Sequence, residues 1–187
     1  TDEIIIPALL NKGVEFKDAY NYPVVGCVEV AVPGKWGYRC TGMTFLNFIK
    51  IVELVINDGH DPRTGMTLYQ GNGTLLDFES FDDLWKSWEK NIAYYTRLSV
   101  ALDVLADTHL EEFPDILCSS LIDSCIERGK TAKEGVAKYD IIAGLQVGLS
   151  NAANAMYALK RAVFEEKILT KEEVFEALKN NFAGIDG

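Results

Sequence analysis

Hydrophobic residues recur at three- and four-residue intervals along most of this chain, which is the spacing of helices with a buried face. Glycines, prolines and capping pairs divide the pattern into segments. Ser80 with Asp83 and Thr170 with Glu173 have the spacing of capping boxes at helix starts. The pattern predicts helices over residues 2–13, 44–58, 80–107 and 115–129, and two more that begin at 150 and 170.

Two of these helices are expected to contribute most to the core. Residues 44–58 carry apolar side chains on nearly every face, so this helix is predicted to be buried almost all round. Trp and Tyr residues of the helix from 80 are interpreted as core, and Cys118 and Cys125 as small buried hydrophobes. The apolar stripe of the helix from 80 consists of Leu84, Trp88, Ile92, Tyr95, Leu98, Leu102 and Leu105.

Two short segments, Tyr22–Glu29 and Tyr139–Gly148, have the apolar composition of strands that lead into loops. The loop from Val30 to Gly42 combines glycines with Trp36 and Tyr38, and it is predicted to pack inward. Two strands do not close into a sheet of their own. The pattern is therefore mainly helical and indicates part of a larger fold.

The run Gly26-Cys27-Val28-Glu29 places a thiol two residues before a carboxylate. If the segment is extended, residues i and i+2 point to the same side, so Cys27 and Glu29 would face one space. Such a pair suits hydrogen abstraction at sulfur beside a general base. A buried cysteine next to a surface glutamate is the alternative, and for an isolated C-x-E pair it is the commoner arrangement.

Composition narrows the class of protein. The 187 residues suffice for one domain with a core, and a formal net charge of −10 argues against nucleic acids and anionic membranes as partners. Four cysteines and two histidines show no metal-ligand spacing, so no metal site is expected. With no signal peptide and no membrane-length apolar run, the cysteines are interpreted as reduced thiols in a soluble cytoplasmic protein.

Four ordered blocks resemble the glycyl radical enzymes, the pyruvate formate-lyase-like superfamily, over nearly the whole chain. The blocks are Gly26–Glu29 with Pro33–Lys35, Ile51–Gly59 with the turn at 61–65, Ser119–Asp140, and Gly144–Lys167. The resemblance implies an α/β fold in which this chain is a predominantly helical segment of a ten-stranded barrel. Residues 22–42 would form the active-site cysteine loop at the barrel's centre.

The family's C-terminal glycyl radical motif is absent from these residues, and the chain opens at Thr1 without a methionine. Residues 1–187 are therefore expected to be the central part of a longer protein and to be inactive alone. Implied partners are the remainder of the same enzyme, a small-molecule substrate, and a second copy of the parent in a homodimer. A radical activating enzyme would bring S-adenosylmethionine and an iron–sulfur cluster, neither of which is expected to bind within this chain.

The resemblance also implies a mechanism. A glycyl radical on a glycine outside this chain would pass to Cys27, whose thiyl would abstract a hydrogen atom from a small hydroxylated substrate. Glu29 would act as general base in the elimination that follows. Because Val28 follows Cys27, the paired cysteines of pyruvate formate-lyase are missing, and C-V-E looks instead like the dehydratases and other eliminases. Two other reactions are alternatives to elimination: arylacetate decarboxylation and acyl transfer like that of pyruvate formate-lyase. A noncatalytic helical interaction module is the alternative from another class of protein.

Arg39, Thr41 and His60 are the further candidates for substrate binding. Residues 37–42 lack the G-W-H-D of familiar glycerol and diol dehydratases, so those polyol contacts are not carried over. Arg39 would either pair with a substrate carboxylate or sulfonate or hold loop carbonyls. His60 would either transfer a proton or lie in a surface turn.

Overall fold

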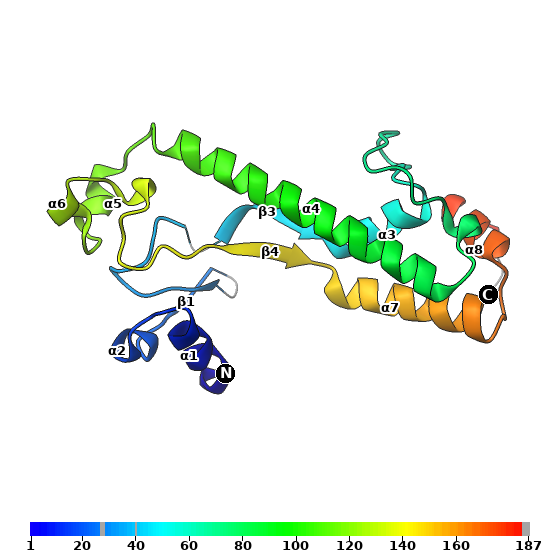
Figure 1. Ribbon diagram of the computed structural model, residues 1–187, viewed down its shortest axis with the longest axis horizontal. Coiled ribbons are helices and arrows are strands. Elements are labelled where there is room, and N and C mark those ends of the chain that lie inside the picture. Colours follow the sequence, from blue (N-terminus) through cyan, green and yellow to red (C-terminus); the bar gives the residue numbers. More distant parts are fainter. Residues whose placement is uncertain (27–28, 40, 185–187) are drawn as a thin grey trace. The chain divides into compact units, whose positions relative to one another are not determined.

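The computed structural model describes residues 1–26, 29–39 and 41–184, and for Thr41, Met43 and Ala143 it describes the backbone alone. The chain divides into two compact units, shown as a ribbon in Figure 1. Unit 1 comprises Thr1–Thr44 and Val100–Leu145, and unit 2 comprises Phe45–Ser99 and Gln146–Gly187. Helices predominate throughout the described part, as the hydrophobic pattern predicts.

Unit 1 is built from short helices and a small hairpin. Its elements are α1 (Asp2–Asn11), α2 (Phe16–Ala19), β1 (Val24–Val25), β2 (Glu29–Val30), the last turns of α4 (Phe81–Leu110), α5 (Ile116–Ser120) and α6 (Cys125–Arg128). Apolar residues of α1 and of the segments around 31–36 and 139 form its larger core, which buries Trp36. The inward packing predicted for the loop after the hairpin is thereby confirmed at Trp36.

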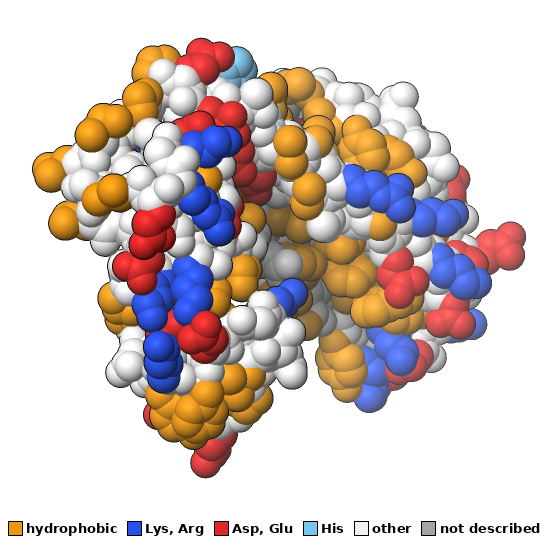
Figure 2. Space-filling model, turned by 60° about the vertical axis from the view of Figure 1, so that its left-hand side comes forward, with side chains coloured by type: hydrophobic (Ala, Val, Ile, Leu, Met, Phe, Trp, Pro, Cys, Tyr) orange, Lys and Arg blue, Asp and Glu red, His pale blue; other side chains and the backbone are white. Residues whose placement is uncertain are grey.

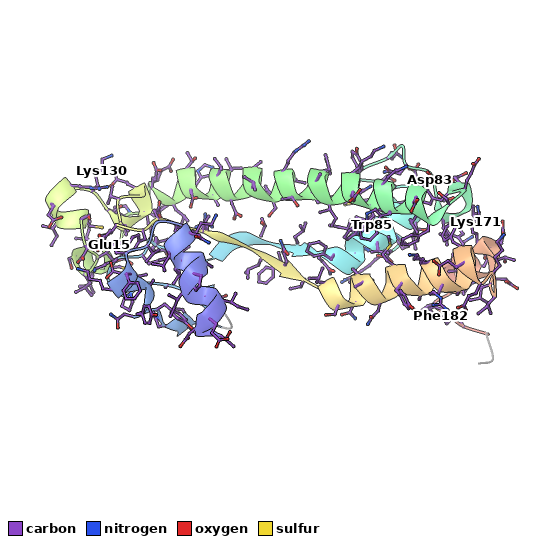
Figure 3. All side chains as sticks on the ribbon, turned by 60° about the horizontal axis from the view of Figure 1, so that its bottom comes forward. Glu15, Asp83, Trp85, Lys130, Lys171 and Phe182 are labelled. Atoms are coloured by element: carbon purple, nitrogen blue, oxygen red, sulfur yellow. The ribbon has the colours of Figure 1, made fainter. Side chains whose placement is uncertain are left out.

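Unit 2 is built around α3 (Phe48–Ile56), which packs against α7 (Leu149–Leu159) and the first turns of α4 (Figure 1). A π-helical stretch (Lys160–Glu165) continues α7, and α8 (Lys171–Lys179) follows. Lys171, at the start of α8, donates hydrogen bonds of 2.8 Å to the carbonyls of Leu76 and Phe78. Figure 3 shows Lys171 and Asp83 at the same end of unit 2.

Two strands, β3 (Thr41–Asn47) and β4 (Ala143–Val147), form a second two-stranded sheet. The strand predicted within 139–148 is confirmed as β4. The helix predicted over 44–58 begins only at Phe48, so its first turn is wrong. Residues 44–47 belong to β3, Phe45 is 67% exposed, and the Asn47 side chain caps α3 by accepting the Lys50 N–H at 3.2 Å.

The helix predicted over 115–129 is also wrong as a single element. It is split into α5 and α6, and Ser124 between them has a φ of +76°, outside the helical range. The N–H of Asp123 bonds to the carbonyl of Gly34 at 2.6 Å, so a partner distant in sequence replaces a helical one. Cys125 is buried as predicted, whereas Cys118 is only partly buried.

The long helix α4 is confirmed, but its apolar stripe is only half covered. Leu84 is fully buried, and Trp88 and Tyr95 pack against the core of unit 2 as predicted. Further along, Leu98 is 44% exposed, and the stripe residues Leu102 and Leu105 are exposed to a similar degree. Hydrophobic side chains from several parts of the chain appear at the surface in Figure 2, in orange. Among the described helices, none has the length and hydrophobicity of a membrane span.

Candidate active site

Cys27 stands in the sequence between two paired strands, β1 and β2. In the antiparallel hairpin of β1 and β2, Val25 pairs with Glu29, so the chain reverses between these two residues. Gly26 starts the reversal with a φ of +59°, a conformation that glycine adopts without steric cost. The strand predicted within 22–29 is confined to Val24 and Val25, which are exposed, and Glu29 already lies on the second strand of the hairpin.

Glu29 is partly buried, and its carboxyl group lies over the backbone of Gly26. A Cβ atom built on Gly26 would stand 2.6 Å from Oε2 of Glu29. The side chain thus folds back toward the start of the loop. Cys27 and Val28 lie outside the described residues, so the approach of the thiol to the carboxylate stays a prediction.

A buried carboxylate fixes the chain that follows the hairpin. Asp18 in α2 accepts hydrogen bonds from Lys35 Nζ at 2.6 Å, from the hydroxyl of Tyr139 at 2.7 Å and from Lys138 Nζ at 3.3 Å. The bond from Lys35, followed by that from Tyr139, holds the pKa of Asp18 well below its usual range. Backbone bonds join Lys35 and Gly37 to Tyr139, which fixes this stretch relative to the segment before β4.

Arg39 is held by two carboxylates of α4. Its side chain is 9% exposed, and its guanidinium lies 3.5 Å from Oδ1 of Asp103 and 3.4 Å from the carbonyl oxygen of the same residue. A second donor of the guanidinium contacts the carboxylate of Asp107. The structural alternative for Arg39 is thus supported by the contacts, and its binding of a substrate anion stays a prediction.

Asp140 is a further candidate residue of the site, and the sequence pattern does not reveal it. Its carboxylate occupies the space between two glycines: a Cβ on Gly37 would stand 2.0 Å from Oδ1, and one on Gly135 would stand 2.9 Å from Oδ2. Burial and then the Asp107 carboxylate raise the pKa of Asp140, while Arg39 lowers it. The two glycines are the only sign of this site in the sequence. They do not predict it by themselves, because only the fold brings them to Asp140.

Asp140 and Arg39 line a cavity of about 170 Å³ within unit 1. Its wall also includes charged and aromatic side chains: Tyr38, Asp107, Glu111, Lys133 and Glu134. Several of these are already engaged, since Lys133 binds the Phe113 carbonyl at 2.7 Å and Glu134 caps the N–H of Thr131. The cavity therefore has mixed charge, and its side chains are mostly committed to contacts within the protein.

His60 and Thr41 are the remaining candidates. His60 lies in unit 2, in the turn after α3, where its exposed ring places Nδ1 3.4 Å from the hydroxyl of Thr67. That exposure favours the surface-turn alternative. Thr41 begins β3, but its side chain lies outside the described part. Across the described ranges, no three His, Cys, Asp or Glu side chains gather as a metal site would require.

Two proteins of known sequence and one solved structure match this chain over nearly its whole length. A protein described as "probable dehydratase YbiW" from Escherichia coli (strain K12) is 44% identical over 187 residues, which are 98% of this chain and 23% of that protein. The (2S)-3-sulfopropanediol dehydratase of Klebsiella oxytoca is 32% identical over 180 residues, or 96% of this chain and 22% of that enzyme. A solved structure, described by 1,2-propanediol dehydration in Roseburia inulinivorans, has 36% identity and a TM-score of 0.88 over 96% of this chain and 22% of that one.

The chain therefore spans 22 to 23% of the length of these relatives. A family model described as pyruvate formate lyase-like matches residues 1–186. Since this match covers nearly all of the sequence, the chain belongs to the pyruvate formate lyase-like family of glycyl radical enzymes, as its four sequence blocks predict.

Proposed function

We propose that this chain carries the cysteine loop of a glycyl radical dehydratase or related lyase. The observation that carries the proposal is the hairpin in which Gly26 and Glu29 bracket Cys27, with the Glu29 carboxyl group folded over the loop's first residue. Two relatives described as dehydratases, 44% and 32% identical, support elimination as the reaction. A small hydroxylated molecule is the substrate class that such a reaction requires.

In this proposal residues 1–187 form the central part of a longer pyruvate formate-lyase-like domain, a ten-stranded α/β barrel with the loop of residues 22–42 at its centre. The remainder of the enzyme, an activating enzyme and a second parent subunit are the proposed macromolecular partners. A glycine outside this chain would carry the radical. The residues present fit that radical source, because the loop between β1 and β2 carries the thiol that would receive the unpaired electron.

The glycyl radical, when present, supplies the unpaired electron that converts the Cys27 thiol into a hydrogen abstractor. The sulfur takes a hydrogen atom from a substrate C–H bond, which forms an S–H bond and leaves a carbon radical. Glu29 accepts the proton of the hydroxyl on that carbon while the leaving group departs from the next carbon with its electron pair, so that a carbonyl forms and the unpaired electron moves to the next carbon. That carbon takes the hydrogen atom back from the Cys27 S–H group, which restores the thiyl radical. Walls that exclude water protect such radicals, and the partly buried position of Glu29 suits this requirement.

The test uses the full-length protein, activated anaerobically with its activating enzyme. Cys27→Ser should keep the glycyl radical signal in electron paramagnetic resonance (EPR) but lose turnover, since a hydroxyl does not replace the thiol as a hydrogen abstractor. Glu29→Gln should keep the signal and lower kcat by about 10²- to 10⁴-fold, the usual contribution of a general base.

Cys118→Ser is the matched control, because Cys118 is a partly buried thiol in the same unit that has no proposed part in catalysis. This variant should turn over normally. Turnover that persists in Cys27→Ser would overturn the assignment of the sulfur. Release of carbon dioxide with no eliminated leaving group would replace elimination by decarboxylation.

A further inference from the structure

We propose that Gly26 is a positioning residue for the Glu29 carboxylate, because its missing side chain leaves the space that the carboxylate occupies. The inference rests on the proposed function, since it concerns the same loop and the same general base. It adds a residue that touches neither the substrate nor the radical. Gly26 would act through Glu29 alone.

The contacts around Gly26 come from one functional group. A Cβ built on Gly26 would stand 2.6 Å from Oε2, 3.2 Å from Cδ and 3.5 Å from Oε1 of Glu29. Among the described residues other than Gly26 and its chain neighbours, these are the three nearest heavy atoms, and all belong to the carboxyl group. The shortest distance lies well inside the contact distance of non-bonded heavy atoms. A methyl group at position 26 and the carboxylate therefore cannot occupy these places together.

The hairpin explains why the carboxylate comes so close. Val25 pairs with Glu29 across the ladder, so Gly26 is the first loop residue on the opposite strand and lies one step from the Glu29 position. Gly26 thus meets two demands: a left-handed backbone, with φ at +59°, and room for the carboxylate. Only the second demand is specific to Glu29.

Gly129 meets the first of these two requirements, the left-handed backbone, without the second, room for a carboxylate. It ends α6 in unit 1 with a φ of +63°, close to that of Gly26, but a Cβ built on it would meet nothing within 4 Å. Alanine at either position imposes the same left-handed backbone on a residue with a side chain. Only at position 26 does the methyl group also displace a catalytic atom. Gly129→Ala is therefore the matched control for backbone strain.

The carboxylate should move before the backbone does. It is the far end of a flexible side chain, so a rotation of the Glu29 side chain relieves the contact while the strand pairing is kept. Displacing a catalytic group by about 1 Å can cost about 10²-fold in rate, because proton transfer needs a defined approach. Gly26→Ala should therefore act on turnover far more than on folding.

The experiment compares four variants of the full-length, activated enzyme: Gly26→Ala, Gly129→Ala, Glu29→Asp and the double variant of positions 26 and 29. Gly26→Ala should keep its EPR signal, lower kcat by about 10- to 100-fold and leave KM within about twofold, as expected for an interaction realised in the transition state. Gly129→Ala should keep kcat within about twofold. A crystal structure of Gly26→Ala should show the Glu29 carboxylate displaced.

Glu29→Asp shortens the side chain by one methylene and withdraws the carboxylate from position 26. The variant alone should lower kcat, but adding Gly26→Ala to it should cost clearly less than Gly26→Ala costs in the wild-type enzyme. Such non-additivity is the signature of two residues that share one contact. Full additivity of the two changes in log kcat would contradict the inference.

Other outcomes also decide the matter. Wild-type kcat in Gly26→Ala, an equal loss in Gly129→Ala, or an unmoved carboxylate in the crystal structure would each overturn the role of Gly26. Loss of the EPR signal in Gly26→Ala would place the effect in radical formation and would also overturn it. If Glu29→Gln turns over like the wild type, the proposed function falls instead, while the crystal structure of Gly26→Ala still decides whether the glycine makes room for the carboxylate.

Discussion

Arg39 ties the segment after the hairpin to α4 by several donors of one planar group. Its side chain is nearly buried, as is that of Asp103, whereas Asp107 is half exposed. A guanidinium can reach two carboxylates and a carbonyl at once, whereas an ammonium group is a compact charge on a flexible stem. The identity of the cation therefore matters here more than its charge.

Replacing Arg39 by lysine should loosen this connection without changing the net charge. Loss of charge-assisted hydrogen bonds costs about 1–3 kcal/mol, and the exposure of Asp107 places the expected value near the lower end. Hydrogen exchange in the full-length protein should show faster exchange of the backbone amides of residues 35–39 and 103–107. The KM for substrate should stay unchanged, since the contacts of Arg39 are with the protein itself.

Arg128→Lys is the control, because Arg128 lies in α6 of the same unit and is exposed. It should alter neither exchange nor KM. A raised KM in Arg39→Lys with unchanged exchange would contradict the structural role and identify Arg39 as a substrate-binding residue.

At the scale of single elements, the start of α8 is fixed by Thr170, the residue just before the helix. Thr170 accepts the Glu173 N–H at 3.1 Å, and the Glu173 carboxylate accepts the N–H and hydroxyl of Thr170 at 2.8 and 3.0 Å. The Thr170 backbone N–H, followed by its hydroxyl, lowers the pKa of Glu173 from its usual value. This reciprocal pair satisfies backbone donors that the helix cannot satisfy itself.

Thr170→Ala should destabilise α8 by about 1 kcal/mol, the usual loss when a capping hydroxyl is removed. Amide exchange over residues 171–175 of the full-length protein is the measurement, and it should accelerate in the variant. Thr108 offers a control, since its residue is exposed and its hydroxyl bonds to the Val104 carbonyl within α4. Faster exchange of the α8 amides in Thr108→Ala, or none in Thr170→Ala, would contradict the role of the cap.

The elements that the sequence pattern predicts correctly are those defined by neighbours in the chain. The capping pairs at Ser80 and Thr170 work within four residues, and both helices begin where predicted. The strand at residues 44–47 was missed because its partner, β4, lies about a hundred residues away. The break before α6 was missed because the Gly34 carbonyl is brought to Asp123 only by the fold.

The same distinction holds for the site. Cys27 and Glu29 could be proposed because they stand two residues apart in a block that resembles a known family. The turn that brings Glu29 over Gly26 depends on strand pairing and left no clear sign in the composition. Asp140 could not be singled out, since the two glycines that accommodate it, Gly37 and Gly135, are far apart in the sequence and only the fold brings both to its carboxylate.

At the scale of the whole molecule, the apolar stripe of α4 is exposed along its second half. Leu98 continues the stripe that begins with the fully buried Leu84, yet it is 44% exposed. The chain spans 22 to 23% of the length of its relatives, so the proposed parent enzyme has other segments available to cover this face. A helix whose stripe is apolar along its length is typical of burial along its length.

We therefore expect Leu98 to be covered by the remainder of the enzyme. Leu98→Ala in the full-length protein should then cost about 2–5 kcal/mol, as for other buried leucines, and Leu84→Ala on the same helix should cost a similar amount. The free energy of opening of α4, obtained from native-state hydrogen exchange, is the measurement. If Leu98 stays exposed in the full-length enzyme, its truncation should cost less than about 1 kcal/mol while that of Leu84 stays costly, and the proposed covering of α4 would be wrong.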